Sequence, residues 1–280
     1  MDLKARLKGH LEEIVRDRHP DFSSGGHFYV QQYISEQFQQ WGNLETHEFD
    51  FHGKTHTNYI LNIAPAKPSS KPPILLAAHY DGVPGTPGAD DNATGVAVLL
   101  ELMREFSQNP PPIPLRFVAF DLEEYGMLGS EAYVQELKEK QEKIRLMFSL
   151  EMLGYCCHDP DSQEYPPGLE NFYPNAGNFI AFIGNFKTST DARFFSRQMQ
   201  NSGTPSEWLA VPFSGMNLTE TRLSDHSPFW DQGYKAIMVT DTSFLRNPHY
   251  HLPSDTIETL DLDFLTRVCE GLIAGLRNWK

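Results

Sequence analysis

Cysteine is scarce in this chain, which has three cysteines among 280 residues. Cys156 and Cys157 are neighbours, and a structural disulfide between adjacent residues would be strained. So few cysteines in an odd number argue against a disulfide-stabilised scaffold and favour a reducing compartment. Neither of the two neighbouring thiols has a supporting partner for catalysis, so we expect both to be ordinary thiols.

Long apolar segments are also missing, because the sequence contains no run of about 18 apolar residues. The opening stretch, MDLKARLKGHLEEIVRDRH, carries charges throughout and lacks the apolar core of a secretory signal. We therefore expect no transmembrane segment and a cytoplasmic location. A mature chain whose leader had been removed would begin in the same way.

Basic residues are fewer than acidic ones, with 23 Lys and Arg against 37 Asp and Glu and a net charge of -14. This balance repels phosphate backbones and anionic membrane surfaces, so we expect neither nucleic acid nor a membrane as a partner. An acidic surface favours cationic ligands such as metal ions and protonated amines, although it is also common on proteins that bind neither. The hydrophobic fraction of 40% is ordinary for a globular protein.

Helical and extended hydrophobic patterns alternate along the chain, as in βαβ units. A helical pair is expected at about residues 1–42, and we find no repeat or linker that would split the chain. The sequence therefore predicts a single α/β domain over residues 1–280, with a mixed, largely parallel central sheet flanked by helices. The expected strands are 46–51, 58–64, 74–78, 115–120, 146–150, 179–183 and 236–240, with later helices at 94–106, after 129, after 188 and from 261.

Polar clusters follow strand ends between Ala78 and Glu124 and together indicate a catalytic metal site. His79 follows an apolar run, where ligand sites gather in open α/β sheets, and Asp81 is placed to accept the second N–H of its imidazole. In GADDNATG, a helix cap would need one acid rather than two, and Asp91 is placed to bridge two metals. Taken singly, each cluster also fits a polar strand end or a helix cap.

Further acids and histidines extend this set. Glu123 and Glu124 leave an apolar strand side by side, which is costly unless they pair or bind cations. One can ligate a metal while the other serves as general base. Glu151 interrupts another apolar strand, although a solvated strand end is the simpler interpretation. His249 and His251 lie in a loop before the last helix, and local context alone identifies neither as a ligand.

The motifs AHYD, GADDNATG, EEYGMLGS, SLEMLGY, SDHSPFW and YHLPSD occur in an order that resembles the zinc-dependent aminopeptidase family. That family includes the bacterial leucyl aminopeptidase, the yeast aminopeptidase Y and, more distantly, the glutaminyl cyclases. The resemblance covers about residues 74–261 and implies a zinc exopeptidase-like fold with two zinc ions. It implies that His79 and Glu151 hold one zinc, that Glu124 and His251 hold the other, and that Asp91 bridges them.

The resemblance also implies roles beyond metal binding. Glu123 would be the general base, Asp81 the carboxylate behind the first histidine ligand, and Tyr250 a hydrogen-bond donor to the transition-state oxyanion. Asp225 and His226 match the SDH stretch of the family, for which we expect either a structural role or a role in supporting the metal ligands. These roles imply an enzyme that hydrolyses the N-terminal residue from peptides with a free N-terminus.

One departure concerns Glu151, because many members of the family have Asp at this position. The longer side chain shifts the carboxylate by about one methylene, so we expect partial occupancy of the zinc that Glu151 shares with His79.

Two alternatives to an aminopeptidase remain open at this point. A glutaminyl-peptide cyclotransferase would use a single zinc, and the uninterrupted EEYGMLGS and GADDNATG motifs disfavour it. A catalytically inactive, peptidase-like binding domain is disfavoured because every proposed ligand is retained. The sequence does not predict side-chain preference or oligomeric state. Phe229, Tyr155 and Phe244 are candidates for an apolar pocket, although aromatic residues beside strands more often belong to the core.

Overall fold

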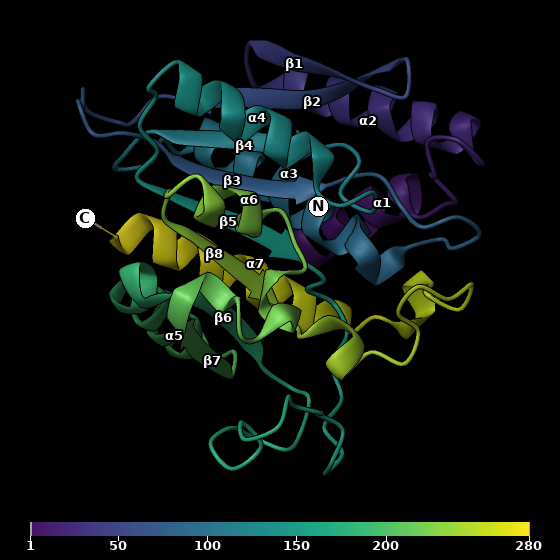
Figure 1. Ribbon diagram of the computed structural model, residues 1–280, viewed down its shortest axis with the longest axis vertical. Helices are drawn as coiled ribbons and strands as arrows, with labels where there is room; N and C mark the ends of the chain where they lie inside the picture. The colour runs from purple at the N-terminus through teal and green to yellow at the C-terminus, as the bar shows by residue number, and fades with distance from the viewer. Residues whose placement is uncertain (1, 280) are drawn as a thin grey trace.

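The computed structural model describes residues 2–279, which form one eight-stranded sheet with helices on both faces (Figure 1). The strand order is β1-β2-β4-β3-β5-β8-β6-β7. Strands β4, β3, β5 and β8 run parallel, whereas β2 joins β4 and β6 joins β8 in antiparallel pairs. The predicted α/β class with a mixed, largely parallel sheet is confirmed. The strands are β1 Leu44–Phe51, β2 Lys54–Ile63, β3 Ile74–His79, β4 Leu115–Phe120, β5 Leu146–Glu151, β6 Ile180–Asn185, β7 Ser206–Val211 and β8 Ala236–Thr240.

The helices are divided between the two faces of the sheet. Figure 1 shows α4 and α6 on the near side, with α3 and α7 behind the sheet. The helices are α1 Leu3–Ile14, α2 Ser24–Trp41, α3 Gly95–Gln108, α4 Leu128–Glu139, α5 Ser189–Asn201, α6 His226–Asp231 and α7 Leu262–Asn278. Shorter helical turns are Ala89–Thr94, Phe186–Thr188, Pro212–Gly215, Thr219–Arg222, Ser243–Leu245 and Ile257–Thr259.

The N-terminal helical pair packs into the same core as the central sheet. Leu7 of α1 and Phe38 of α2 belong to the hydrophobic cluster that also contains Leu99 of α3 and Leu76 of β3. Every residue of β3 is buried, as expected for a central strand covered on both faces. The assignment of residues 1–280 to one catalytic domain stays a prediction.

Two elements were missing from the sequence prediction. Strand β7 lies at the edge of the sheet with four of its six residues half-buried, so it lacks a continuous apolar run. Helix α6 has only six residues and contains Pro228, so it is too short for helical periodicity to show. Strand β2 also begins earlier than expected, because His52 and Gly53 adopt positive φ angles and form a two-residue hairpin turn.

Three further structural findings bear on the sequence predictions. None of the helices within residues 2–279 is long and apolar enough to span a membrane. Cys156, Cys157 and Cys269 are all free thiols. The parallel strands β3, β4, β5 and β8 end at the same edge of the sheet, which brings the loops that follow them together.

Candidate metal centre

The carboxyl ends of β3 and β5 bring a first group of ligand atoms together. His79 is the last residue of β3, and only 1% of its surface is exposed. Its Nε2 lies 3.4 Å from Asp91 Oδ1 and 3.5 Å from Glu151 Oε1, the carboxylate that ends β5. One donor atom from each of the three residues lies within 4.8 Å of the other two. Imidazole nitrogen and carboxylate oxygen are typical zinc ligands.

A second group uses the other oxygen of the same aspartate. His251 Nε2 lies 3.0 Å from Asp91 Oδ2 and 3.5 Å from Glu124 Oε2. These three residues also present donor atoms within 4.8 Å of one another. The structure therefore brings together all five residues predicted as metal ligands, in two groups that share Asp91.

The donor atoms fit a bound cation. Both ring nitrogens of His79, Oε1 of Glu124 and Nε2 of His251 are buried, and none of them forms an aligned hydrogen bond with a described residue although carboxylates lie close to the ring nitrogens. Buried polar atoms in native proteins nearly always have a partner. A divalent cation coordinated by these atoms would supply what they lack.

The electrostatics of the site also fit a cation. Burial raises the pKa of Glu123 and of Glu124 well above the usual range, and neighbouring carboxylates raise both further. Burial lowers the pKa of His79, but the carboxylates of Glu151 and Glu123 outweigh this and raise it well above its usual value. Burial would raise the pKa of Asp91, but contacts with His251 and His79 lower it. A divalent cation would offset this concentration of negative charge.

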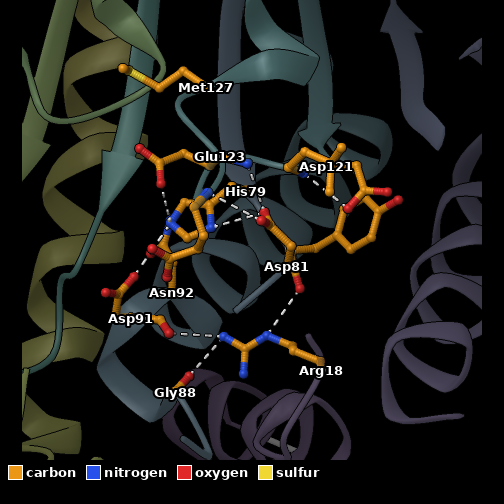
Figure 2. Close-up of polar contacts among 12 residues, drawn as sticks. Arg18, His79, Asp81, Gly88, Asp91, Asn92, Asp121, Glu123 and Met127 are labelled. Atoms are coloured by element: carbon orange, nitrogen blue, oxygen red, sulfur yellow. Dashed lines mark hydrogen bonds and ion pairs between the residues drawn. The ribbon is translucent and has the colours of Figure 1, made fainter. Parts of the chain in front are cut away.

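Asp81 connects the first group with the turn that carries the paired glutamates. Its Oδ1 lies 3.4 Å from Nδ1 of His79, and the hydrogen bond expected between them from the sequence stays a prediction. Its two oxygens also accept the backbone N–H groups of Glu123, at 3.0 Å, and Glu124, at 3.1 Å. The Glu123 carboxylate turns toward His79, with Oε2 4.0 Å from Nε2 (Figure 2). One buried carboxylate thus fixes both β3 and the turn after β4.

The loop that carries Asp91 is held by residues that the sequence analysis did not identify. Arg18 is fully buried and donates to the backbone carbonyls of Tyr80, Gly88 and Asp91 at 3.0, 2.9 and 3.0 Å (Figure 2). Asp255 accepts the N–H of Asp91 at 3.1 Å. A side chain at Gly88, where φ is 61°, would place its Cβ 2.4 Å from the Asp91 carbonyl oxygen. The Arg18 side chain therefore joins the N-terminal region to the candidate metal centre.

The SDH stretch lies beneath the first group. The Ser224 hydroxyl donates to Glu151 Oε2 at 2.7 Å, a contact that the sequence did not predict. Burial raises the pKa of Asp225 to about 7. Burial lowers the pKa of His226 to about 3, and Nε2 of this residue lies 2.8 Å from the Thr221 carbonyl oxygen. Neither Asp225 nor His226 belongs to a metal-binding group among residues 2–279, and the structural or supporting role expected for them stays a prediction.

Tyr250 lies at the entrance of the second group. Its ring stacks on the ring of His251, with centroids 3.7 Å apart, and burial raises the pKa of its phenol. His249, two residues earlier in the loop than His251, instead contacts Ser254 Oγ at 3.0 Å through Nδ1. The loop therefore directs only one of its two histidines toward Asp91.

A cavity of about 270 Å³ opens beside the two groups. Asp91, Glu123, Glu124 and Tyr250 line one end of it, and Phe244 also lines it. The other two aromatic candidates lie elsewhere. Phe229 is fully buried in the core between α4, α6 and the sheet, and Tyr155 is not among the residues that line the cavity.

A third group of potential ligands, Cys156, His158 and Asp261, lies apart from the cavity. Burial raises the pKa of the Cys156 thiol to about 11, which favours the protonated form over the thiolate that binds metals. Asp261 already accepts the N–H groups of Asp263 and Phe264 at the start of α7. These contacts give Asp261 a structural role as a helix cap.

Comparison with known proteins places the chain in a family. Residues 58–275 match the family model described as peptidase family M28. The uncharacterized protein YfbL of Escherichia coli is 35% identical over 268 residues, which cover 89% of this chain and 79% of YfbL. Aminopeptidase YwaD of Bacillus subtilis is 31% identical over 231 residues, which cover 81% of this chain but 45% of YwaD.

Solved structures share the fold of this chain. The structure of BSAP, described as a zinc aminopeptidase from Bacillus subtilis, superposes with a TM-score of 0.59 at 27% identity, covering 80% of this chain and 50% of that one. A glutaminyl cyclase from Bacteroides thetaiotaomicron has the same fold, with a TM-score of 0.70 at 18% identity and coverage of 99% and 97%. The family match spans most of the sheet and all five candidate ligands, and the chain belongs to peptidase family M28.

Proposed function

We propose that this chain is a zinc-dependent aminopeptidase that releases the N-terminal residue of peptides. The observation that carries the proposal is the sharing of Asp91, whose two oxygens face two separate groups of ligand atoms. Under this proposal His79, Asp91 and Glu151 would hold one zinc, and Asp91, Glu124 and His251 would hold another. The similarity to proteins named as aminopeptidases, one of them described as a zinc aminopeptidase, supports the proposal.

The chemistry divides between the metals and the residues of the chain. Zinc, when bound, supplies Lewis-acid activation of the scissile carbonyl and of the attacking water. Glu123 lies within the cavity with its carboxylate toward His79, and it accepts the proton of the attacking water. The same carboxyl then donates that proton to the leaving amine nitrogen.

Two other parts of the cavity contribute to binding. Tyr250 lines it beside His251, and under this proposal it would donate its phenolic hydrogen to the oxyanion that develops on the substrate carbonyl. Its raised pKa keeps the phenol protonated, as a donor requires. The carboxylates at this end attract the protonated N-terminus of a peptide, which favours an exopeptidase.

A direct test starts from the full chain after removal of metals with a chelator. We expect negligible hydrolysis of a leucyl 4-nitroanilide in the metal-free protein and recovery after zinc is added. Mass spectrometry of a peptide substrate should then show loss of a single N-terminal residue. Absence of hydrolysis by the zinc-loaded protein across a panel of aminoacyl substrates would contradict the proposal.

A glutaminyl-peptide cyclotransferase is the second candidate, because a cyclase structure superposes over nearly the full length of both chains. Two groups of ligand atoms instead of one favour the peptidase. The mass of the product formed from a glutaminyl peptide distinguishes the two activities. Cyclisation releases ammonia and leaves a pyroglutamyl peptide of full length, whereas hydrolysis releases glutamine and shortens the peptide.

A further inference from the structure

The floor of the cavity contains a row of residues that crosses four strands. Glu151 of β5 pairs with Thr240 of β8, Thr240 pairs with Ala181 of β6, and Ala181 pairs with Glu207 of β7. All four residues line the same cavity. Neighbouring strands lie about 4.8 Å apart, so the Cα atoms of Glu151 and Glu207 are separated by about 14 Å. The two side chains between them are short and leave the space between the carboxylates open.

The wall around Glu207 is mostly apolar. This face of β6 and β8 carries Phe179, Ile183 and Met238, which form a small hydrophobic cluster against Tyr165 and Leu209. Helices α4 and α6 pack beside it on β2, β5 and β8, and the cavity lies where they do not cover the sheet. The long segment between β5 and β6, which descends below the sheet in Figure 1, contributes Tyr165 to this wall. An extended apolar stem of a substrate side chain would pack favourably against these residues.

The charged residues that line the cavity are all acidic. Six of the lining residues carry carboxylates, and none of the described lining residues is Lys, Arg or His. Four of these carboxylates belong to the candidate metal centre, where two zinc ions and the substrate ammonium would offset their charge. Glu207 and Glu220 lie outside that centre. The cavity is therefore suited to a second positive charge and disfavours an acidic side chain.

Glu207 has no partner of its own. Within residues 2–279, no hydrogen bond or ion pair to its half-buried carboxylate is present, and burial is the cause that raises its pKa. A partly desolvated carboxylate without a partner costs free energy that a cationic ligand can recover. An entirely apolar substrate side chain would increase this cost by covering the carboxylate.

From the row, the apolar wall and the unpaired carboxylate, we infer that Glu207 selects substrates whose N-terminal residue is lysine or arginine. The inference rests on the proposed aminopeptidase function. A lysine side chain extends about 6 Å from Cα to its amine. The Glu207 side chain and a hydrogen bond of about 2.8 Å can span the remaining distance to a substrate bound beside Glu151. The aliphatic stem would lie over Thr240 and Ala181.

The test compares two substrates that differ only in the amine. Lysyl and norleucyl 4-nitroanilides share the same four-carbon stem, so the ratio of their kcat/KM values isolates the contribution of the charge. With the zinc-loaded full chain we expect lysine to be preferred by about tenfold, and we expect Glu207→Gln to reduce that ratio by about tenfold. Glu207→Gln should retain or raise hydrolysis of the norleucyl substrate, because its apolar side chain no longer covers a carboxylate, and this hydrolysis also reports that the variant is folded. Glu164→Gln, a change at an exposed carboxylate that does not line the cavity, is the matched control and should leave the ratio unchanged.

A binding measurement separates this inference from the proposed function. Calorimetric titration of the zinc-loaded protein with L-lysine and with L-norleucine reports selectivity without any turnover. Hydrolysis without a lysine preference, or with a preference that Glu207→Gln does not reduce, overturns the role of Glu207 and leaves the aminopeptidase standing. Selective lysine binding that Glu207→Gln abolishes, without hydrolysis of any aminoacyl substrate, overturns the aminopeptidase and supports the cation site. If the zinc-loaded wild-type protein shows neither hydrolysis nor selective lysine binding, the proposed aminopeptidase function and the role of Glu207 are both overturned.

Discussion

At the end of the cavity that contains Asp91, every carboxylate lies within 4.0 Å of His79 or His251, whereas at the opposite end Glu207 lies against apolar side chains without a partner among the described residues. Hydrogen bonds from Arg18 hold the loop that carries Asp91, and the Asp81 carboxylate accepts hydrogen bonds from the turn that carries Glu123. The Ser224 hydroxyl donates a hydrogen bond to Glu151. This contrast fits a metal end that serves catalysis and an opposite end, at Glu207, that serves substrate selection. Catalysis needs donor atoms in a fixed geometry, but selection of a side chain needs a group that is left available for the substrate.

The largest effect should come from the proposed general base at the metal end. Glu123→Gln keeps the shape of the side chain but removes the group that accepts a proton, so kcat/KM should fall by about 10³-fold. Zinc content, measured by atomic absorption, should stay unchanged because Glu123 belongs to neither ligand group. The same substitution at Glu139, an exposed residue at the end of α4, is the control. Near-wild-type hydrolysis by Glu123→Gln would exclude the proposed role.

The two histidines of the last loop test whether the metal end depends on individual ligands. His251→Ala should weaken zinc binding at the second group by about 100-fold or more, because it removes a nitrogen donor from a three-residue set. His249→Ala should leave zinc binding unchanged, since that residue contacts Ser254 instead. Equal zinc content in the wild-type protein and the two variants, measured at limiting free zinc, would remove His251 from the ligand set.

Arg18 tests whether distant residues hold the loop that carries Asp91. Arg18→Met preserves much of the side-chain volume but leaves the carbonyls of Gly88 and Asp91 without this donor. We expect the free energy of unfolding, measured with urea on metal-free protein, to fall by about 2–4 kcal/mol, because each buried carbonyl that loses its donor costs about 1–3 kcal/mol. Zinc affinity should fall as well, although every ligand is retained. Arg197→Met, at an exposed position of α5, should change neither quantity, and an equal response of the two variants would argue against the role of Arg18.

A smaller effect should appear in the pH dependence of stability. The pKa of His226 is about 3 in the folded protein and 6.5 without burial, so the unfolded state binds more protons between these values. The contribution of neutral His226 to stability is therefore complete above pH 6.5 and is lost as pH falls toward 3. Between pH 7 and pH 5 we expect this residue to account for about 2 kcal/mol of lost stability. Urea unfolding of wild type and His226→Gln should show that difference, and parallel pH profiles would contradict it.

Much of the metal end was predictable because its residues adjoin strong local patterns. His79 and Glu151 end buried apolar strands, and Glu124 comes shortly after one, so each stands out as a polar residue where the pattern predicts burial. The carboxyl ends of parallel strands meet at one edge, which made their convergence a reasonable expectation. His251 had no such signal, since only the resemblance to a family distinguished it from His249.

The supporting residues could not be predicted for a related reason. Arg18 lies in a charged stretch near the start of the chain, and nothing local distinguishes a buried arginine from an exposed one. Its hydrogen bonds reach carbonyls about 60 to 70 residues further along the chain, so they depend on how α1 packs against the loop after β3. Strand β7 was missed because an exposed edge strand needs no continuous apolar run.

The sequence by itself determined the alternation of helices and strands and the positions of the polar residues at strand ends, because burial imposes a periodic pattern on neighbouring residues. Only the tertiary structure decided that Arg18 holds the loop that carries Asp91, and that Glu207 shares a row and a cavity with Glu151. Strand order and register bring these residues together across long sequence separations. Strand order and register follow from the packing of the whole chain, so no short segment of the sequence predicts them.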